Sequence, residues 1–172
     1  MKQLGRVLTA MVTPFDRAGK VDVPTAQRLA RHLVANGSDG LVIVGTTGES
    51  PTLTHDEKLA MFRAAVEAVG SDGSVVAGTG SNDTAATIAL TQEAEAIGVD
   101  ALLLIAPYYN KPNQEGLYRH FKAVAEATRL PIILYNHPPR TGVSIAPETL
   151  KRLVSIPNIV ALKDSSASLD VA

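Results

Sequence analysis

The run Ile159-Val160-Ala161-Leu162-Lys163 begins about 27 residues after the run Ile132-Ile133-Leu134-Tyr135, an interval that fits one strand–helix unit. Both runs are apolar at successive positions, and each ends in a side chain with a polar tip. Continuous apolar runs are typical of strands that are covered on both faces, as in a parallel sheet. The two runs therefore predict neighbouring parallel strands joined by a helix.

The same pattern extends toward the N-terminus, where four further runs predict strands: Val7–Val12, Gly40–Val44, Ser74–Gly78 and Ala101–Ile105. The starts of all six runs lie about 27 to 34 residues apart, as expected for repeated β-α units. The segments between them have helical spacing and predict five helices: Val23–Ala35, Thr54–Val69, Thr84–Ile97, Gln114–Thr128 and one that starts at Pro147. Thr54 and Glu57 match the capping box that opens a helix.

This alternation favours either a doubly wound sheet or a (β/α)8 barrel. The first strand is not followed by G-x-G-x-x-G, which argues against a nucleotide-binding doubly wound sheet. A closed barrel needs eight strands, and such barrels rarely fall below about 200 residues. The sequence therefore predicts an incomplete (β/α)8 barrel, with residues 1–172 as the N-terminal portion of a single barrel domain whose C-terminal part is missing.

The composition is that of an ordinary globular domain: 172 residues, 45% hydrophobic, 19% charged and a formal net charge of −1. This charge gives no reason to expect nucleic acid or an anionic membrane as a partner. No apolar stretch reaches the ~18 residues of a membrane span, and residues 1–6 lack the apolar core of a signal peptide. The absence of cysteine fits a reducing compartment, so we expect a cytoplasmic protein.

Lys163 is the residue that says most about chemistry. Burial at the end of an apolar strand disfavours the ammonium form, and a neutral amine forms a Schiff base with a carbonyl compound. The alternative is a strand-end lysine whose ammonium group reaches into water. In a barrel the active site lies at the C-terminal ends of the strands, where Tyr135 would be a neighbour of Lys163 about 4.8 Å away. A phenol there could relay the protons of carbinolamine formation and dehydration.

Other polar side chains follow the predicted strand ends. The hydroxyl of Thr46, within Gly45–Gly48, could complete a proton wire between two phenols, although the same loop could be a plain turn or a weak phosphate cradle. The planar fork of Arg140 suits a carboxylate, or it could be a surface charge. Tyr108 and Tyr109 could line the site or be packing residues with solvated hydroxyls.

The four histidines do not suggest a metal site. His32, His55 and His120 fall on predicted helices, and we expect them to be solvated. His137 lies at the mouth of the predicted site, where a lone histidine is more often a spectator than a ligand. No cluster of histidine and acidic residues has metal-ligand spacing, so we expect no metal ion.

Three segments resemble the pyruvate-dependent class I aldolases and lyases of the dihydrodipicolinate synthase type: Thr13–Phe15, Gly45–Ser50 and Tyr135–Gly142, the last followed by Lys163. The resemblance extends along the whole chain. It implies a (β/α)8 barrel that condenses pyruvate with L-aspartate 4-semialdehyde to 4-hydroxy-tetrahydrodipicolinate, on the diaminopimelate route to lysine. It also implies a covalent lysine imine with pyruvate in place of a cofactor, and a homo-oligomer that is a dimer of dimers in the full-length protein.

The resemblance implies catalytic roles for four residues. Lys163 would hold the pyruvate imine. Tyr135 would be the general acid and base, linked through Thr46 to Tyr109. In the family, the tyrosine at the Tyr109 position reaches across a tight dimer interface into the neighbouring site.

Two further residues would bind substrate carboxylates by the same resemblance: Thr47 that of pyruvate and Arg140 that of the aldehyde. The arginine lies in Tyr-Asn-x-Pro-x-Arg-Thr-Gly, a motif that relatives such as N-acetylneuraminate lyase usually lack. Asp164–Ser166 follow Lys163 where the synthase often has Glu-Ala, and this tripeptide also occurs in sister aldolases. A sister pyruvate-dependent aldolase acting on another 2-oxo acid is therefore the alternative, together with an inactive fragment or an assembly module.

An effector site for lysine is also implied, but in degraded form. Inhibited family members use a histidine and a glutamate at the dimer interface, and those positions hold Lys58 and Ala86 here. Lys58 would repel a cationic ligand, and Ala86 lacks the carboxylate that would attract one. The other members of the site are retained: Ser50, His55, Asn82 and Tyr108. The resemblance thus implies weak feedback inhibition by lysine.

Overall fold

The computed structural model describes residues 4–167. The chain divides into two units, which we describe separately: one comprises Met1–Gly78 and Glu93–Ala101, and the other comprises Thr79–Gln92 and Leu102–Ala172. The backbone passes from one unit to the other after β3 (Ser74–Gly78), within α3 (Thr84–Ile97) and at the first residue of β4 (Ala101–Ile105). Within the described residues, no helix is long and apolar enough to cross a membrane.

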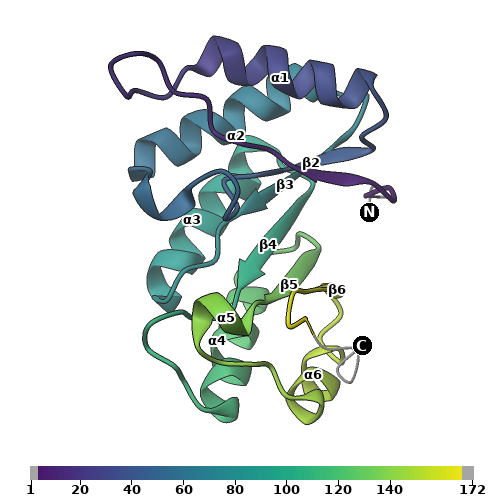
Figure 1. Cartoon of the computed structure of the whole chain (residues 1–172). Helices are drawn as coiled ribbons and strands as arrows, with labels where there is room; N and C mark the ends of the chain where they lie inside the picture. The colour runs from purple at the N-terminus through teal and green to yellow at the C-terminus, as the bar shows by residue number, and fades with distance from the viewer. Residues whose placement is uncertain (1–3, 168–172) are drawn as a thin grey trace. The chain divides into compact units, whose positions relative to one another are not determined.

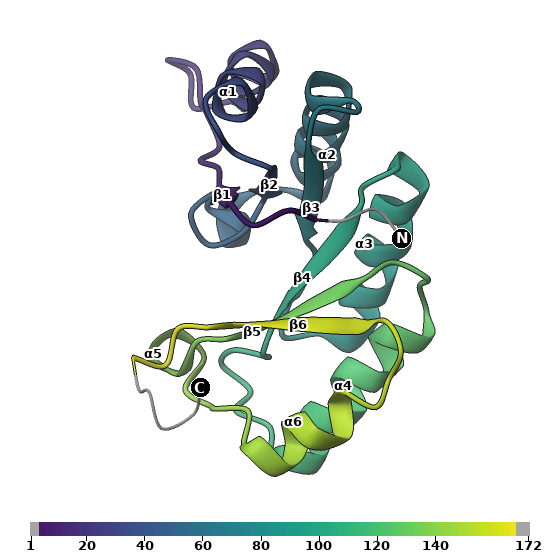
Figure 2. The same ribbon diagram turned by 90° about the vertical axis from the view of Figure 1, so that its right-hand side faces the viewer.

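The first unit contains three parallel strands in sequence order: β1 (Leu8–Ala10), β2 (Gly40–Ile43) and β3. The side chains of β2 and β3 are buried throughout, as the continuous apolar runs predict. Two helices, α1 (Val23–Ala35) and α2 (His55–Val69), pack against each other and lie side by side in Figures 1 and 2. A short 3-10 helix, η1 (Ser50–Thr52), precedes α2.

Local capping explains where α2 begins. The backbone N–H of Glu57 donates to the hydroxyl of Thr54 at 3.3 Å, and the backbone N–H of Thr54 donates to the Glu57 carboxylate at 2.8 Å. This reciprocal pair satisfies two donors that a helix start leaves without intrahelical partners. The bond from the Thr54 backbone, together with one that the Thr54 hydroxyl donates to the same carboxylate at 2.8 Å, holds the pKa of Glu57 below its usual value.

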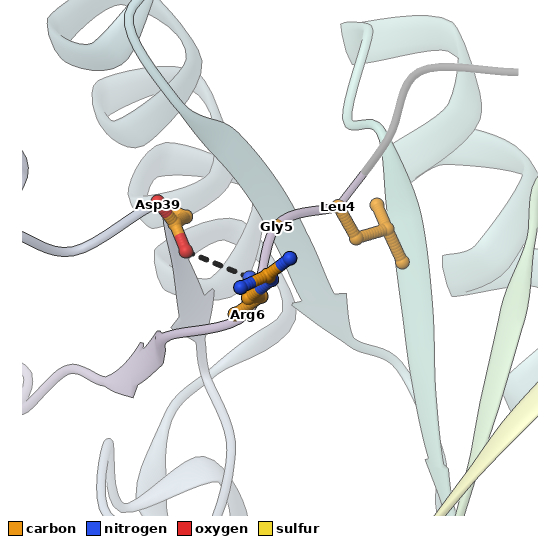
Figure 3. A pocket seen from close by; sticks show the side chains of 4 residues that line it. All are labelled: Leu4, Gly5, Arg6 and Asp39. Carbon is orange, nitrogen blue, oxygen red and sulfur yellow. Dashed lines mark hydrogen bonds between the residues drawn. The ribbon is translucent and has the colours of Figure 1, made fainter.

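A carboxylate also fastens the start of β1. Oδ2 of Asp39 accepts a hydrogen bond from the backbone N–H of Arg6 at 2.7 Å (Figure 3). It also accepts one from the backbone N–H of Val7 at 2.8 Å. These bonds, that from Val7 first, lower the pKa of Asp39. A pocket lined by Leu4, Gly5, Arg6 and Asp39 lies beside them. The N-terminal segment is thereby tied to the residue that precedes β2.

The second unit contains β4, β5 (Ile132–Asn136) and β6 (Ile159–Asp164), which are parallel and paired in sequence order. On one side lie α4 (Gln114–Glu126) and α6 (Pro147–Leu153), which pack together and run side by side in Figure 2. Oε1 of Gln114 accepts from the backbone N–H of Ala146 at 3.0 Å and from the hydroxyl of Thr149 at 2.7 Å, which fixes the start of α6 on the start of α4.

Several predicted boundaries agree with the structure, among them those of α1, α3, β3 and β4. The helix predicted over Gln114–Thr128 ends two residues earlier, at Glu126. Two short helices were not predicted among the described residues: η1 and α5 (Pro138–Thr141). Proline is favoured in the first turn of a helix, so Pro138 and Pro139 are compatible with this single turn.

The prediction that the last strand is buried is wrong. Of the β6 side chains only that of Ile159 is buried, and Val160 is 45% exposed. β6 pairs with β5 along one edge, and no strand among residues 4–167 pairs with its other edge. An edge strand of this kind keeps much of its surface in contact with solvent, whatever its apolar content.

The expectation that His120 is solvated is also wrong, because its side chain is only 5% exposed. It lies on the buried face of α4 with Leu117, Phe121 and Val124. This spacing of i, i+3, i+4 and i+7 is that of a single helical stripe. Nδ1 of His120 is 2.8 Å from the hydroxyl of Thr84.

Candidate active site

Tyr135 and Lys163 lie opposite each other in the register of β5 and β6. The Nζ atom of Lys163 is 4.5 Å from the centroid of the Tyr135 ring. The predicted proximity of these residues is therefore confirmed. Tyr135 is 5% exposed and Lys163 is half-buried, so the amine lies against the ring of a packed phenol. An amine beside a phenol is suited to imine chemistry, which needs protons delivered and removed.

Sequence reasoning assigned no role to the next residue on each strand. Asn136 is fully buried, and its side-chain amide donates to Oδ1 of Asp164 at 2.7 Å. The Ser166 hydroxyl also donates to Asp164, and these two bonds, that from Ser166 first, lower the pKa of the Asp164 carboxyl. The only signal in the sequence is position, because each residue directly follows a proposed catalytic one.

Arg140 lies on α5, at the mouth of the same strand end. Its Nε donates to Nε2 of His137 at 3.1 Å, and the His137 ring makes an edge-on contact with Tyr135 at 5.6 Å between centroids. His137, expected to be a spectator, therefore touches both residues. Because Nε carries the bond to His137, the two terminal amino groups of the exposed guanidinium can take both oxygens of a carboxylate.

The loop after β2 belongs to the first unit. The hydroxyl of buried Thr13 donates to the carbonyl of Gly48 at 2.7 Å, which ties this loop to the segment after β1. Thr46 is half-buried and Thr47 is exposed. The turn starts at Val44, whose φ of 58° is unusual for a β-branched residue. The loop is thus a fixed turn that presents two threonine hydroxyls.

Tyr109 lies in the loop after β4 and is 88% exposed. Its φ of 67° places it in the left-handed region, and the backbone N–H of Asn110 donates to the Tyr108 carbonyl at 2.7 Å. The Asn110 amide also donates to the carbonyl of Asn82 at 2.7 Å. A large aromatic side chain is therefore held outward on a short, well-fastened loop.

The predicted effector residues divide between the units. Ser50, His55 and Lys58 lie in the first, and Asn82, Ala86 and Tyr108 in the second. Nε2 of His55 contacts the carboxylate of Glu93 at 2.7 Å, and burial lowers the pKa of Lys58.

The predicted catalytic and substrate residues divide likewise: Thr46 and Thr47 lie in the first unit, and Tyr109, Tyr135, Arg140 and Lys163 in the second. Within the second unit the structure brings Tyr135 and Lys163 together, with Arg140 joined to them through His137. Over residues 4–167, no group of three or more histidine and acidic side chains is placed to hold a metal ion.

Comparison with known proteins places this arrangement in a family. The model of the dihydrodipicolinate synthetase family matches residues 3–172. The 4-hydroxy-tetrahydrodipicolinate synthase of Moorella thermoacetica is 62% identical over 170 residues, covering 99% of this chain and 58% of that enzyme. The chain belongs to the dihydrodipicolinate synthetase family.

Solved structures agree with this assignment. Dihydrodipicolinate synthase DapA-2 of Bacillus anthracis matches with a TM-score of 0.97 and 51% identity, covering 99% of this chain and 59% of that one. The chloride-inhibited synthase of Acinetobacter baumannii, complexed with pyruvate, matches with a TM-score of 0.95 and 43% identity, covering 98% and 58%. The fold is thus that of a partial (β/α)8 barrel, and the chain spans rather more than half the length of these relatives.

Proposed function

We propose that the protein condenses pyruvate with L-aspartate 4-semialdehyde to give 4-hydroxy-tetrahydrodipicolinate, a step of lysine and diaminopimelate biosynthesis in the cytoplasm. The observation that carries the proposal is the position of the Lys163 amine, 4.5 Å from the ring centroid of Tyr135 on the neighbouring strand. Membership of the family supports it, as does the pyruvate bound by the A. baumannii relative.

The chemistry starts at the Lys163 amine. Nζ attacks the keto carbon of pyruvate to form a carbinolamine, which loses water to give the imine. Tyr135 delivers the proton that departs with water and later accepts one. Loss of a proton from the methyl carbon gives an enamine, which forms the new carbon–carbon bond with the aldehyde carbon. The amino group of the aldehyde substrate then attacks the imine carbon, which closes the ring and releases the Lys163 amine. Because the imine itself accepts the electron pair, the reaction needs no external cofactor.

The remaining residues orient the substrates. Thr47 binds the carboxylate of pyruvate, and the guanidinium of Arg140 binds that of the aldehyde. Thr46 links Tyr135 to Tyr109 in a proton wire.

A second copy of the chain completes the site in this proposal. Tyr109 is 88% exposed on a fastened loop, which suits a side chain that enters a neighbouring subunit. Aromatic side chains are enriched where protein surfaces meet. We therefore propose a homo-oligomer, a dimer of dimers, in which Tyr109 serves the partner's site.

The test is a condensation assay on the protein expressed from its entire reading frame, with pyruvate and aspartate 4-semialdehyde. We expect turnover in the unaltered protein and in Lys151→Arg, whose lysine is exposed on α6 and pairs with Glu148. Lys163→Arg should be inactive, because the guanidinium cannot form the imine. Equal turnover in Lys163→Arg and the unaltered protein would refute the proposal.

A sister activity is the second candidate, because Asp164–Ser166 stand where the synthase often has Glu-Ala. Such an aldolase would form the same pyruvate imine and differ in its aldehyde. Competing aspartate 4-semialdehyde against sugar-acid aldehydes distinguishes the two. A higher kcat/KM for a sugar-acid aldehyde would assign the protein to the sister class.

A further inference from the structure

One polar pair lies directly behind the proposed catalytic pair. Asn136 follows Tyr135, Asp164 follows Lys163, and the two are partners in the same strand register. Successive side chains of a strand point to opposite faces, so this pair lies on the face opposite the Lys163 amine. The Asn136 amide donates to Asp164 Oδ1 at 2.7 Å. The bond joins a buried amide to a charged acceptor, which makes it stronger than a neutral one.

Both residues of the pair accept further hydrogen bonds. Oδ1 of Asn136 accepts from the backbone N–H of Ile145 at 3.1 Å, which ties it to the loop between α5 and α6. Oδ2 of Asp164 accepts from the backbone N–H of Ser166 at 3.1 Å. Asn136 has no exposed surface. Asn136 is therefore anchored to a second segment, and its bond to Asp164 ties the end of β6 to that anchor.

The pairing of β6 with β5 is irregular, so the Asn136–Asp164 bond is important for the register of β6. Ile132 pairs with Ile159 but the next residue, Ile133, pairs with Ala161, so the ladder is interrupted at Val160. The rest of β6 is held weakly, because only Ile159 is buried. A slip of one residue would turn every later side chain to the other face of the sheet. Such a slip would move the Lys163 amine away from the Tyr135 ring.

We propose that Asn136 and Asp164 form a positioning pair that locks the end of β6 in register and so holds the Lys163 amine over Tyr135. The inference rests on the proposed function, because it matters for catalysis only if Lys163 forms the imine. Neither side chain touches the substrate. The expected consequence is on the rate of bond formation, since a misplacement of about 1 Å costs as much as 100-fold.

The test measures how fast pyruvate forms a borohydride-reducible adduct on Lys163, in the protein expressed from its entire reading frame. Asp164→Ala should lower the limiting rate at saturating pyruvate by about 10-fold or more, with a smaller change in half-saturation. Asp164→Asn should stay close to the unaltered rate, because its amide oxygen still accepts from Asn136. Glu148→Ala is the matched acidic control, because the Glu148 side chain is exposed on α6, and it should change nothing.

Reversing the pair separates positioning from simple loss of structure. Asn136→Asp alone places two carboxylates in contact and should slow the adduct. Adding Asp164→Asn restores one donor and one acceptor, and the rate should recover. If Asp164→Ala does not fold, the comparison of Asn136→Asp with the double variant still tests the positioning role.

Two results would overturn the inference: a full rate in a folded Asp164→Ala protein, or a reversed pair that folds but stays as slow as Asn136→Asp. A missing adduct in the unaltered protein is a different result, because it would refute the proposed function itself.

Discussion

In the proposed function Arg140 binds the carboxylate of the aldehyde, and its side chain is exposed. Arg140→Ala should raise the KM for the aldehyde by about 10- to 100-fold, since a hydrogen bond to a charged group contributes about 1.5–3 kcal/mol. The pyruvate imine should still form. Arg152→Ala is the control, because Arg152 pairs with Glu115 on α4. Imine formation that fails as badly as aldehyde turnover would contradict the assignment.

Lysine inhibition is a second residue-scale prediction. The resemblance implies an effector site in which Lys58 stands where inhibited family members have a histidine, and in which Ala86 offers no carboxylate to an incoming ammonium group. We expect lysine to inhibit only at millimolar concentrations or above, because like charges repel. Replacing both residues, Lys58→His with Ala86→Glu, should strengthen inhibition. Dose–response curves measure the effect, and strong inhibition of the unaltered protein by sub-millimolar lysine would contradict it.

His120 makes stability depend on pH. Burial lowers its pKa from 6.5 to about 4, with the Asp83 carboxylate opposing the shift. The unfolded chain therefore binds a proton at a higher pH than the folded one. The contribution of neutral, buried His120 to the free energy of unfolding is about 3 kcal/mol. It is complete above pH 6.5 and is lost as pH falls through about 4. Urea unfolding at several pH values should show this loss in the unaltered protein and a flatter profile in His120→Gln. Identical profiles would show that His120 does not titrate in this way.

At the scale of elements, β3 supports the turn that ends β2. A Cβ built on Gly78 would lie 2.4 Å from the carbonyl oxygen of Val44, so only glycine fits beside that residue's left-handed backbone. Gly78→Ala should cost about 1–3 kcal/mol of unfolding free energy, as overpacking does. It should also weaken pyruvate binding through Thr47. Gly116→Ala in α4 is the control, since its Cβ would come no closer than 3.1 Å to any neighbour. Equal stability of the two variants would contradict this account.

Sequence reasoning succeeded for elements whose boundaries are set locally. The ends of α1 and α2 depend on caps within a few residues, such as the reciprocal Thr54–Glu57 bonds. It failed where tertiary contacts decide, as for the exposure of β6, which depends on what lies along its other edge. The burial of His120 could have been predicted, because the residue lies in a helical stripe with Leu117, Phe121 and Val124. The Asn136–Asp164 bond depends on strand register across an irregular ladder, which no local pattern specifies.

For the whole molecule, the chain spans 58% of the M. thermoacetica enzyme, and β6 carries Lys163 along an edge that no described strand covers. We expect the polypeptide 1–172 by itself to show little turnover and to associate through that edge, because unpaired apolar strands template association. Supplying the remaining part of a relative's barrel in trans should restore activity. Sizing and turnover assays measure both effects. A monomer that unfolds cooperatively and turns over fully would contradict this prediction.

The central claim is that Lys163 forms the imine with pyruvate, and mass mapping of the borohydride-reduced adduct tests it most directly. The protein expressed from its entire reading frame is incubated with pyruvate and borohydride, digested, and compared with Lys163→Arg. The account predicts one pyruvate-derived adduct on the peptide that contains Lys163, none in Lys163→Arg, and no modification of the exposed Lys151. An adduct on another lysine, or none in the unaltered protein, would contradict the claim.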